Sequence, residues 1–228
     1  MPPDVPPSPL HSPDELRDRV AAMVGRFKRD EAGLPLPATL PPIVQLGHPV
    51  LRSGTPEYTG ELPDELLAGL LEVMRATMHA APGVGLAAPQ IGLPLRIAVV
   101  EDTFPLDAAV AGVRERVPLE YFAAINPSYV ARGDRTASFY EGCLSFSGYQ
   151  AVVERPAQIL ATFTTERGET VRRAFTGWPA RILAHETDHL DGTVYIDKAI
   201  TRSLATGAEY SQRWAAPDID AARTGLGF

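Results

Sequence analysis

Residues 185–192 read His-Glu-Thr-Asp-His-Leu-Asp-Gly, and this stretch indicates both a helix and a chemistry. On an α-helix, side chains four residues apart lie on one face, so His185 and His189 can reach one metal ion with Glu186 beside them. Two neutral imidazoles and a carboxylate are the minimum set for metal-assisted hydrolysis, because the metal acidifies a bound water and the carboxylate takes its proton. The alternative is an amphipathic helix with two half-buried histidines.

A catalytic metal site of this kind needs a third protein ligand. The metzincin pattern is excluded because Tyr195 occupies the position of its third histidine. Glu209 follows His189 by twenty residues on an expected helix, as the third ligand does in thermolysin-like enzymes. Cys143 lies in Glu-Gly-Cys-Leu-Ser at 141–145, and a thiolate is a strong ligand for a borderline-soft divalent ion. Spacing alone does not choose between Cys143 and Glu209.

The bulk composition excludes several classes of function. The chain has 228 residues, of which 45% are hydrophobic and 21% charged, as in an ordinary globular protein. Its net charge of −7 provides no broad basic field, so we expect no direct binding to nucleic acid or to anionic membranes. Cys143 is the single cysteine, which excludes an intramolecular disulfide and favours a reducing compartment. The N-terminus lacks the features of a secretory signal, so we expect a cytoplasmic protein.

The chain divides by composition into three parts. Residues 1–42 hold ten of the 22 prolines, and we expect an extension there with a short helix near Leu16–Arg29, capped by Ser12 with Pro13 in its first turn. A compact domain is expected over 43–203, followed by a C-terminal helix and tail over 204–228.

Within the compact domain, periodicity predicts both helices and strands. Helices are expected over Asp64–Ala80, Gly177–Leu190 and Ile200–Trp214. Strands are expected over Leu95–Val100, Tyr121–Ile125, Gln158–Thr165 and Glu169–Phe175, with an irregular loop over 102–118. The predicted fold class is therefore α+β, a single domain with mostly antiparallel sheets packed around a central metal-binding helix.

Three segments, in this order, resemble the motifs of the peptide deformylase family. They are Gly-Val-Gly-Leu-Ala-Ala-Pro-Gln at 83–90, Glu-Gly-Cys-Leu-Ser at 141–145, and the histidine stretch at 185–192. The likeness spans about residues 43–200 and includes His-Pro-Val-Leu-Arg at 48–52. It implies an enzyme that removes the N-formyl group from formyl-methionyl N-termini of newly made polypeptides and releases formate.

The resemblance also implies a role for each matching residue. Cys143, His185 and His189 would be the ligands of one divalent metal, with Fe(II) as the usual ion and nickel, cobalt or zinc as replacements. Glu186 would be the general acid/base when a metal-bound water attacks the formyl carbon. Two donors, the Gln90 amide and the Leu144 N–H, would hold the formyl oxygen. The backbone of Gly83, Val84 and Gly85 would pair with the extended peptide.

Two departures from the family pattern leave the substrate preference open. Ala184 stands where the family commonly has glutamine, and Phe146-Ser147 stands where it often has Val-Pro. A deformylase of a small or non-ribosomal formylated molecule is one alternative; an endopeptidase with Glu209 as ligand and an inactive binding module are others. Residues 198–228 contain four basic and three acidic residues, which offers RNA little attraction, so we expect at most transient proximity to the ribosome.

Overall fold

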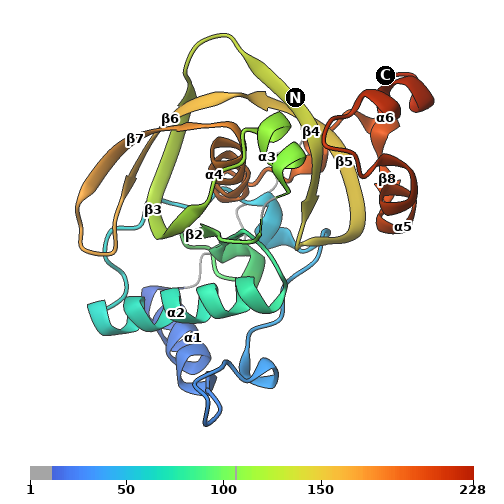
Figure 1. Cartoon of the computed structure of the whole chain (residues 1–228). Helices are drawn as coiled ribbons and strands as arrows, with labels where there is room; N and C mark the ends of the chain where they lie inside the picture. Colours follow the sequence, from blue (N-terminus) through green and yellow to red (C-terminus); the bar gives the residue numbers. More distant parts are fainter. Residues whose placement is uncertain (1–11, 106) are drawn as a thin grey trace.

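Two antiparallel sheets lie around one central helix in the computed structural model, which describes residues 12–105 and 107–228 (Figure 1). The larger sheet has the strand order β1-β2-β3-β6-β7 and the smaller one the order β4-β5-β8. The larger sheet consists of β1 (Gly85–Ala87), β2 (Ile97–Asp102), β3 (Leu119–Ala131), β6 (Gln158–Thr164) and β7 (Thr170–Thr176). The smaller one consists of β4 (Thr136–Cys143), β5 (Phe146–Pro156) and β8 (Ala205–Thr206). The α+β prediction is confirmed.

The central helix is α4 (Gly177–Leu190), with the bounds that the sequence predicts. It packs against β1, β2, β3 and β7 of the larger sheet and against β5 of the smaller one. Gly177 begins the helix with φ +64°, and a Cβ there would lie 2.4 Å from the carbonyl oxygen of Glu115. Glycine is therefore required at this entry, and most of the helix behind it is buried.

A second layer of helices covers one side of the larger sheet. α2 (Asp64–Ala80) has the predicted bounds and buries one apolar face. α1 (Pro13–Arg26) begins at the predicted Ser12 cap, where Glu15 completes a capping box, and ends at Arg26 rather than Arg29. Its buried side chains Leu16 and Val20 join the core cluster that contains the α2 leucines and methionines. Residues 1–11 of the expected extension lie outside the described residues.

Several local predictions were wrong. A short helix, α3 (Ala108–Arg114), lies within the expected loop 102–118, because Asp107 caps an alanine-rich turn. Strands β4 and β5 were not predicted, since their alternation of buried and exposed residues is irregular. Short 3-10 turns occupy Pro37–Thr39, Pro49–Arg52, Ala88–Ile91, Tyr195–Asp197 and Thr201–Ser203.

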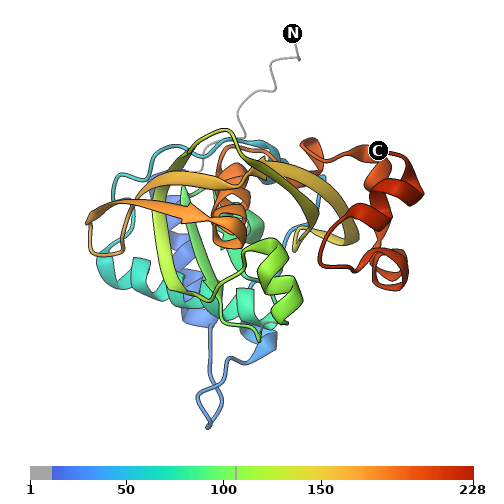
Figure 2. The same ribbon diagram turned by 45° about the horizontal axis from the view of Figure 1, so that its top comes forward.

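The predicted helix Ile200–Trp214 was wrong over its first half, and only residues 207–214 are α- or π-helical. The segment contains β8, the short α5 (Gly207–Glu209) and a π-helical turn over Tyr210–Trp214, followed by α6 (Asp220–Leu226). β8 adds to the edge of β5, with Tyr149 opposite Thr206 and Gln150 opposite Ala205, and this pairing replaces the helical hydrogen bonds there. Figures 1 and 2 both place these C-terminal elements beside β5, away from the β6–β7 hairpin. Within the described ranges, no helix is long and apolar enough to cross a membrane.

Candidate metal centre and active-site cleft

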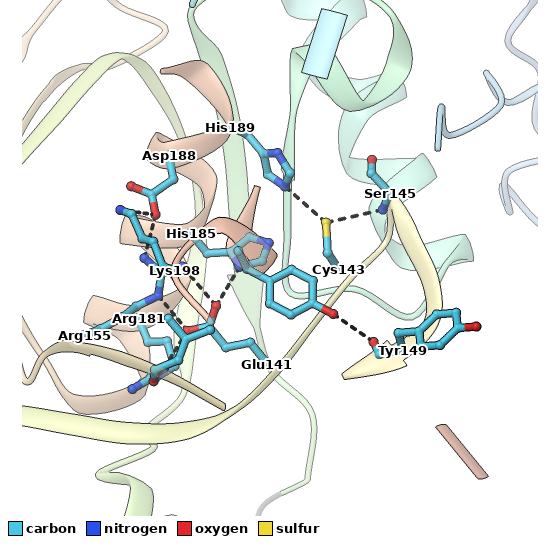
Figure 3. Close-up of polar contacts among 12 residues, drawn as sticks. Glu141, Cys143, Ser145, Tyr149, Arg155, Arg181, His185, Asp188, His189 and Lys198 are labelled. Carbon is cyan, nitrogen blue, oxygen red and sulfur yellow. Dashed lines mark hydrogen bonds and ion pairs between the residues drawn. The ribbon is translucent and has the colours of Figure 1, made fainter. Parts of the chain in front are cut away.

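The thiol and the two imidazoles singled out from the sequence lie together. Ligand atoms of Cys143, His185 and His189 are all within 4.8 Å of one another. The Sγ of Cys143 is 3.2 Å from the Nε2 of His189 (Figure 3). Both histidines come from α4, and Cys143 is the last residue of β4, so the cluster lies where the helix meets the smaller sheet. A thiolate with two imidazoles suits a divalent first-row transition metal.

Glu141 fixes the orientation of His185. Its Oε2 is 3.0 Å from the Nδ1 of His185, which leaves the Nε2 of the ring for a metal (Figure 3). Burial alone would raise the pKa of Glu141, but Arg155 and His185 hold that pKa well below its usual range. Glu141 is therefore an ionised acceptor for the imidazole N–H.

Two buried arginines hold Glu141 in turn. Arg155 donates from Nε and Nη2 to the two carboxylate oxygens at 2.6 and 3.0 Å, and Arg181 donates to Oε1 at 2.5 Å. Arg155 also donates to Asp188 at 2.7 Å, and Asp188 lies between the two histidines in the sequence of α4. Asp188 accepts from two further groups, the Tyr129 hydroxyl and the Lys198 ammonium. Because each buried charge has partners of opposite sign, the network can stay ionised inside the protein.

Glu186 lies in a different environment from Glu141. It is only 5% exposed, and its Oε2 has no hydrogen-bond partner among the described residues. Burial raises the pKa of Glu186 to about 7, against the opposing effect of His185 and Arg155. A carboxyl group that titrates near neutrality can both accept and return a proton.

Gly85 gives the Glu186 side chain its space. A Cβ on Gly85 would lie 2.3 Å from the Oε1 of Glu186, so any larger residue would displace that carboxylate. Gly83, Val84 and Gly85 line a cleft with a volume of about 490 Å³, which also reaches Cys143, His185 and Glu186. β1 is an edge strand of the larger sheet, and an edge strand can pair with an extended peptide.

Gln90 and Leu144 lie at the same cleft. The Oε1 of Gln90 accepts from the N–H of Ala87 at 2.8 Å, which turns the Nε2 toward Cys143, 3.6 Å from its Sγ. The side chain of Gln45 braces the turn after Cys143, since its Nε2 donates to the Leu144 carbonyl at 3.0 Å and its Oε1 accepts from the N–H of Ser147 at 3.2 Å. The amide of Gln90 and the turn at Leu144 are thus held on two sides of the cysteine.

A family model described as polypeptide deformylase matches residues 40–204. The chain belongs to the peptide deformylase family. Peptide deformylase 3 of Streptomyces avermitilis is 54% identical over 187 residues, which cover 82% of this chain and 84% of that protein. Peptide deformylase 1 of Streptomyces coelicolor is 49% identical over 187 residues, or 82% of this chain and 86% of that protein.

Solved structures agree with this assignment. The Met-Ala-Ser-bound class I type b peptide deformylase of Acinetobacter baumannii is 30% identical, with a TM-score of 0.62, covering 70% of this chain and 98% of that chain. The expectation of the family and of the enzyme class is confirmed. Peptide deformylases are metal-dependent enzymes, and the Cys143, His185 and His189 cluster of this deformylase is a group that can hold such an ion.

The position of Glu209 removes the endopeptidase alternative. Glu209 lies in α5 on the surface and pairs with Arg213 at 2.7 Å. It is not among the grouped donors of the deformylase site. The twenty-residue spacing from His189 was misleading because Glu209 follows β8, which pairs with the edge of β5, and its side chain lies at the surface.

The two departures from the family pattern lie in different places. Phe146 and Ser147 line the cleft, and the Phe146 ring stacks on Tyr149 at 5.1 Å between centroids. Ala184 is buried among the residues that α4 packs against the larger sheet. Ile182 lines the cleft, whereas Leu183 is fully buried in the core.

Sequence reasoning missed three residues that support the deformylase site. Arg155, Arg181 and Gln45 carry no local signal, because each acts through a partner distant in the sequence. Only Glu141 could have been inferred, since it belongs to the motif around Cys143.

Proposed function

We propose that this deformylase removes the N-formyl group from formyl-methionyl N-termini of newly made polypeptides and releases formate. The observation that carries the proposal is the buried carboxylate of Glu186, whose Oε2 has no hydrogen-bond partner in the part of the chain that the structure describes. It lies beside the Cys143, His185 and His189 cluster, at a cleft that opens along an edge strand. This arrangement combines a metal site, a proton carrier and a surface for an extended peptide.

The donor set fits one divalent ion, which Cys143, His185 and His189 would hold. The Nδ1 of His185 is engaged by Glu141, which leaves its Nε2 free for an ion, and the Nε2 of His189 is the ring nitrogen that lies 3.2 Å from the Cys143 Sγ. When bound, the ion supplies Lewis acidity and lowers the pKa of its water toward neutrality. We propose Fe(II) as the native ion, with nickel, cobalt or zinc able to replace it.

Glu186 is proposed as the general acid/base. Its free Oε2 takes the proton of the attacking water and later delivers it to the amine nitrogen as the C–N bond breaks. The pKa of about 7 favours both transfers near neutral pH, since the group is neither strongly acidic nor permanently protonated there.

The formyl oxygen gains negative charge as the carbon becomes tetrahedral. We propose that the Nε2 of Gln90 and the backbone N–H of Leu144 donate to that oxygen. The hydrogen bond from the N–H of Ala87 to the Oε1 of Gln90 supports this role, because it fixes which end of the amide faces the cysteine. Loss of one such donor typically costs on the order of 3 kcal/mol in the transition state.

The peptide would lie as an added strand along Gly83, Val84 and Gly85, with its formyl end at Cys143. Ile182 and Trp178 supply apolar surface in the same cleft for the methionine side chain. We propose a cytoplasmic enzyme that meets its substrate near the ribosome only transiently, because the net charge of −7 disfavours lasting contact with RNA.

Formate release from formyl-Met-Ala-Ser tests the proposal. Protein purified anaerobically and loaded with Fe(II) is compared with Glu186→Gln and with a matched surface control, Glu154→Gln. We expect rapid release by the native and Glu154→Gln proteins and at least a hundredfold slower release by Glu186→Gln. No release from native protein that retains its metal would contradict a nascent-chain substrate and direct the search to small formylated molecules.

A further inference from the structure

The turn after the cysteine is a two-residue hairpin loop. Cys143 on β4 pairs with Phe146 on β5, and Leu144 and Ser145 lie between them. Loops of this length usually contain residues with positive φ, because such turns match the twist of the two strands. Neither Leu144 nor Ser145 has a positive φ. The loop therefore lacks the backbone conformation that usually holds a short hairpin, and contacts from outside the hairpin fix its geometry.

These contacts come from a segment that precedes the loop by about a hundred residues. The Nε2 of Gln45 donates to the carbonyl of Leu144 at 3.0 Å, and its Oε1 accepts from the N–H of Ser147 at 3.2 Å. The next residue, Leu46, donates from its N–H to the carbonyl of Ser145 at 2.7 Å. Both ends of the loop are thus tied to one short stretch of chain.

One peptide group of the loop is held on both of its edges. Its carbonyl is that of Leu144, which accepts from Gln45, and its N–H is that of Ser145, which donates to the Sγ of Cys143 at 3.4 Å (Figure 3). Because a peptide group is planar, these two hydrogen bonds fix its orientation. The peptide group just before it lies between this fixed plane and β4, and it carries the Leu144 N–H that is the proposed donor to the formyl oxygen.

The same segment also contacts the turn that carries the other proposed donor. Val44 donates from its N–H to the carbonyl of Gln90 at 2.9 Å. Val44 and Leu46 are two residues apart, so their backbone positions differ by no more than about 7 Å. The Gln90 turn follows β1 of the larger sheet, whereas the Leu144 loop joins two strands of the smaller sheet. The segment therefore limits the distance between the two donors, which belong to different parts of the fold.

We propose that Gln45 is a positioning residue, which holds the Leu144 N–H where it can donate to the formyl oxygen together with the Gln90 amide. The inference rests on the proposed function. Gln45 is exposed and does not line the cleft, so it acts through Leu144 and not on the peptide itself. A donor contributes most to catalysis when it is already aimed at the developing charge, because it then needs no reordering during the reaction.

The test removes the side-chain hydrogen bonds of Gln45 in two ways. Gln45→Ala truncates the side chain, and Gln45→Met keeps its length without the amide. Gln212→Ala is the matched control, because Gln212 is an exposed glutamine that does not line the cleft. Steady-state formate release from formyl-Met-Ala-Ser gives kcat per bound metal ion and KM for each Fe(II)-loaded protein. Hydrogen–deuterium exchange, followed by mass spectrometry, reports how readily residues 141–150 open.

We expect both Gln45 variants to lose about tenfold in kcat per bound metal ion, with KM within about twofold of the native value, since the donor is misplaced and not absent. Residues 141–150 should exchange faster in both variants. The Gln212→Ala protein should match the native enzyme in rate and in exchange. If Gln45→Ala does not fold, Gln45→Met alone gives the comparison.

Three results would overturn the positioning role and leave the proposed function standing. They are a native kcat in the Gln45 variants, a lower kcat without faster exchange of residues 141–150, and a loss of rate that disappears when the rate is expressed per bound metal ion. In the last case Gln45 would support the Cys143 ligand instead of the donor. No release by native enzyme that retains its metal would overturn the proposed function, and the positioning role with it.

Discussion

The carboxylate of Glu141 lies 3.0 Å from the Nδ1 of His185, and Glu186 follows His185 directly in the chain. Two buried glutamates thus flank one imidazole, and their protonation differs. Arg155 pairs with Glu141 and keeps it ionised, whereas burial raises the pKa of Glu186 to about 7. One carboxylate orients an imidazole and the other is the proposed proton carrier, and the position of an arginine separates the two environments.

Replacement of Glu141 should affect stability and metal affinity together. Glu141→Gln leaves Arg155 and Arg181 without their shared anionic partner, so we expect the free energy of unfolding to fall by about 3–5 kcal/mol. We also expect affinity for the metal to fall about 10–100-fold, because His185 loses its orienting acceptor. Urea unfolding and competition with a chelator measure the two effects. Glu154→Gln, exposed on β5, should change neither; an unchanged metal affinity in Glu141→Gln would contradict the orienting role.

A methyl group at Gly85 should impair activity specifically. Gly85→Ala places a Cβ where it would lie 2.3 Å from the Oε1 of Glu186, and the carboxylate must move. A displacement of a reacting group by about 1 Å can cost about a hundredfold in kcat. Gly54→Ala is the control, because no atom lies within 4 Å of a Cβ at that position. Equal kcat values for the two variants would show that Glu186 adapts without loss.

Metal content distinguishes Cys143 from Glu209, the two candidates for the third ligand between which the sequence spacing did not choose. Cys143→Ser should lose most of its bound metal after dialysis, since the thiolate is one of three grouped donors. Glu209→Gln should retain the metal, because its carboxylate pairs with Arg213 on the surface. Elemental analysis of the two proteins after identical loading gives the comparison. Metal loss from Glu209→Gln alone would reverse the assignment.

The loss of folding stability at low pH should depend in part on Glu101. Hydrogen bonds from Arg75, and then from His79, lower the pKa of this buried carboxylate below its ordinary value. The unfolded chain therefore binds the Glu101 proton more readily than the folded one, so this stabilisation is complete above about pH 4.3 and is lost as pH falls through the folded pKa. Glu101→Gln should have a lower Tm than the native protein at pH 6. The difference between the two Tm values should become smaller as the pH approaches 3. The exposed Glu57→Gln should follow the native curve; a constant difference across this range would argue against the linkage.

Helix α1 should contribute to global stability. Val20 is fully buried against the core that includes α2, so Val20→Ala should reduce the free energy of unfolding by about 2 kcal/mol. Val130→Ala, at a 63% exposed position on β3, should have little effect. Denaturant unfolding with a single transition gives both values. Equal stability of the two variants would mean that the α1 helix detaches in solution before the core unfolds.

The spacing of apolar residues predicted those helices that bury one face and expose the other. Helices α2 and α4 each carry an apolar face on a continuous 3.6-residue pattern, and both bounds agree with the structure. Strands β4 and β5 lack a regular alternation, because they are covered in places by the C-terminal segment and by 3-10 turns. The C-terminal segment misled the prediction because pairing with β5 is a tertiary effect that local propensity does not contain.

The motifs predicted the grouped donors but not their support. His185 and His189 are linked by helical spacing, so their proximity follows from the sequence. The proximity of Cys143 does not, and came only from the resemblance to a family. Arg155 lies 14 residues from Glu141 and Arg181 lies 40 residues from it, outside any local pattern, and nothing in their neighbourhood distinguishes them from surface arginines. The domain boundaries at residues 42 and 203 stay predictions.

The ion pairs among Glu141, Arg155 and Asp188 have a consequence for how the enzyme matures. Because these pairs join protein groups to one another, His185 is held in place through Glu141 without help from an ion. Folding can therefore come first and loading second, unlike in small zinc domains that collapse only around their metal. We therefore expect the folded enzyme to exchange its ion without unfolding, and the supply of ions in the cell to decide which metal it holds.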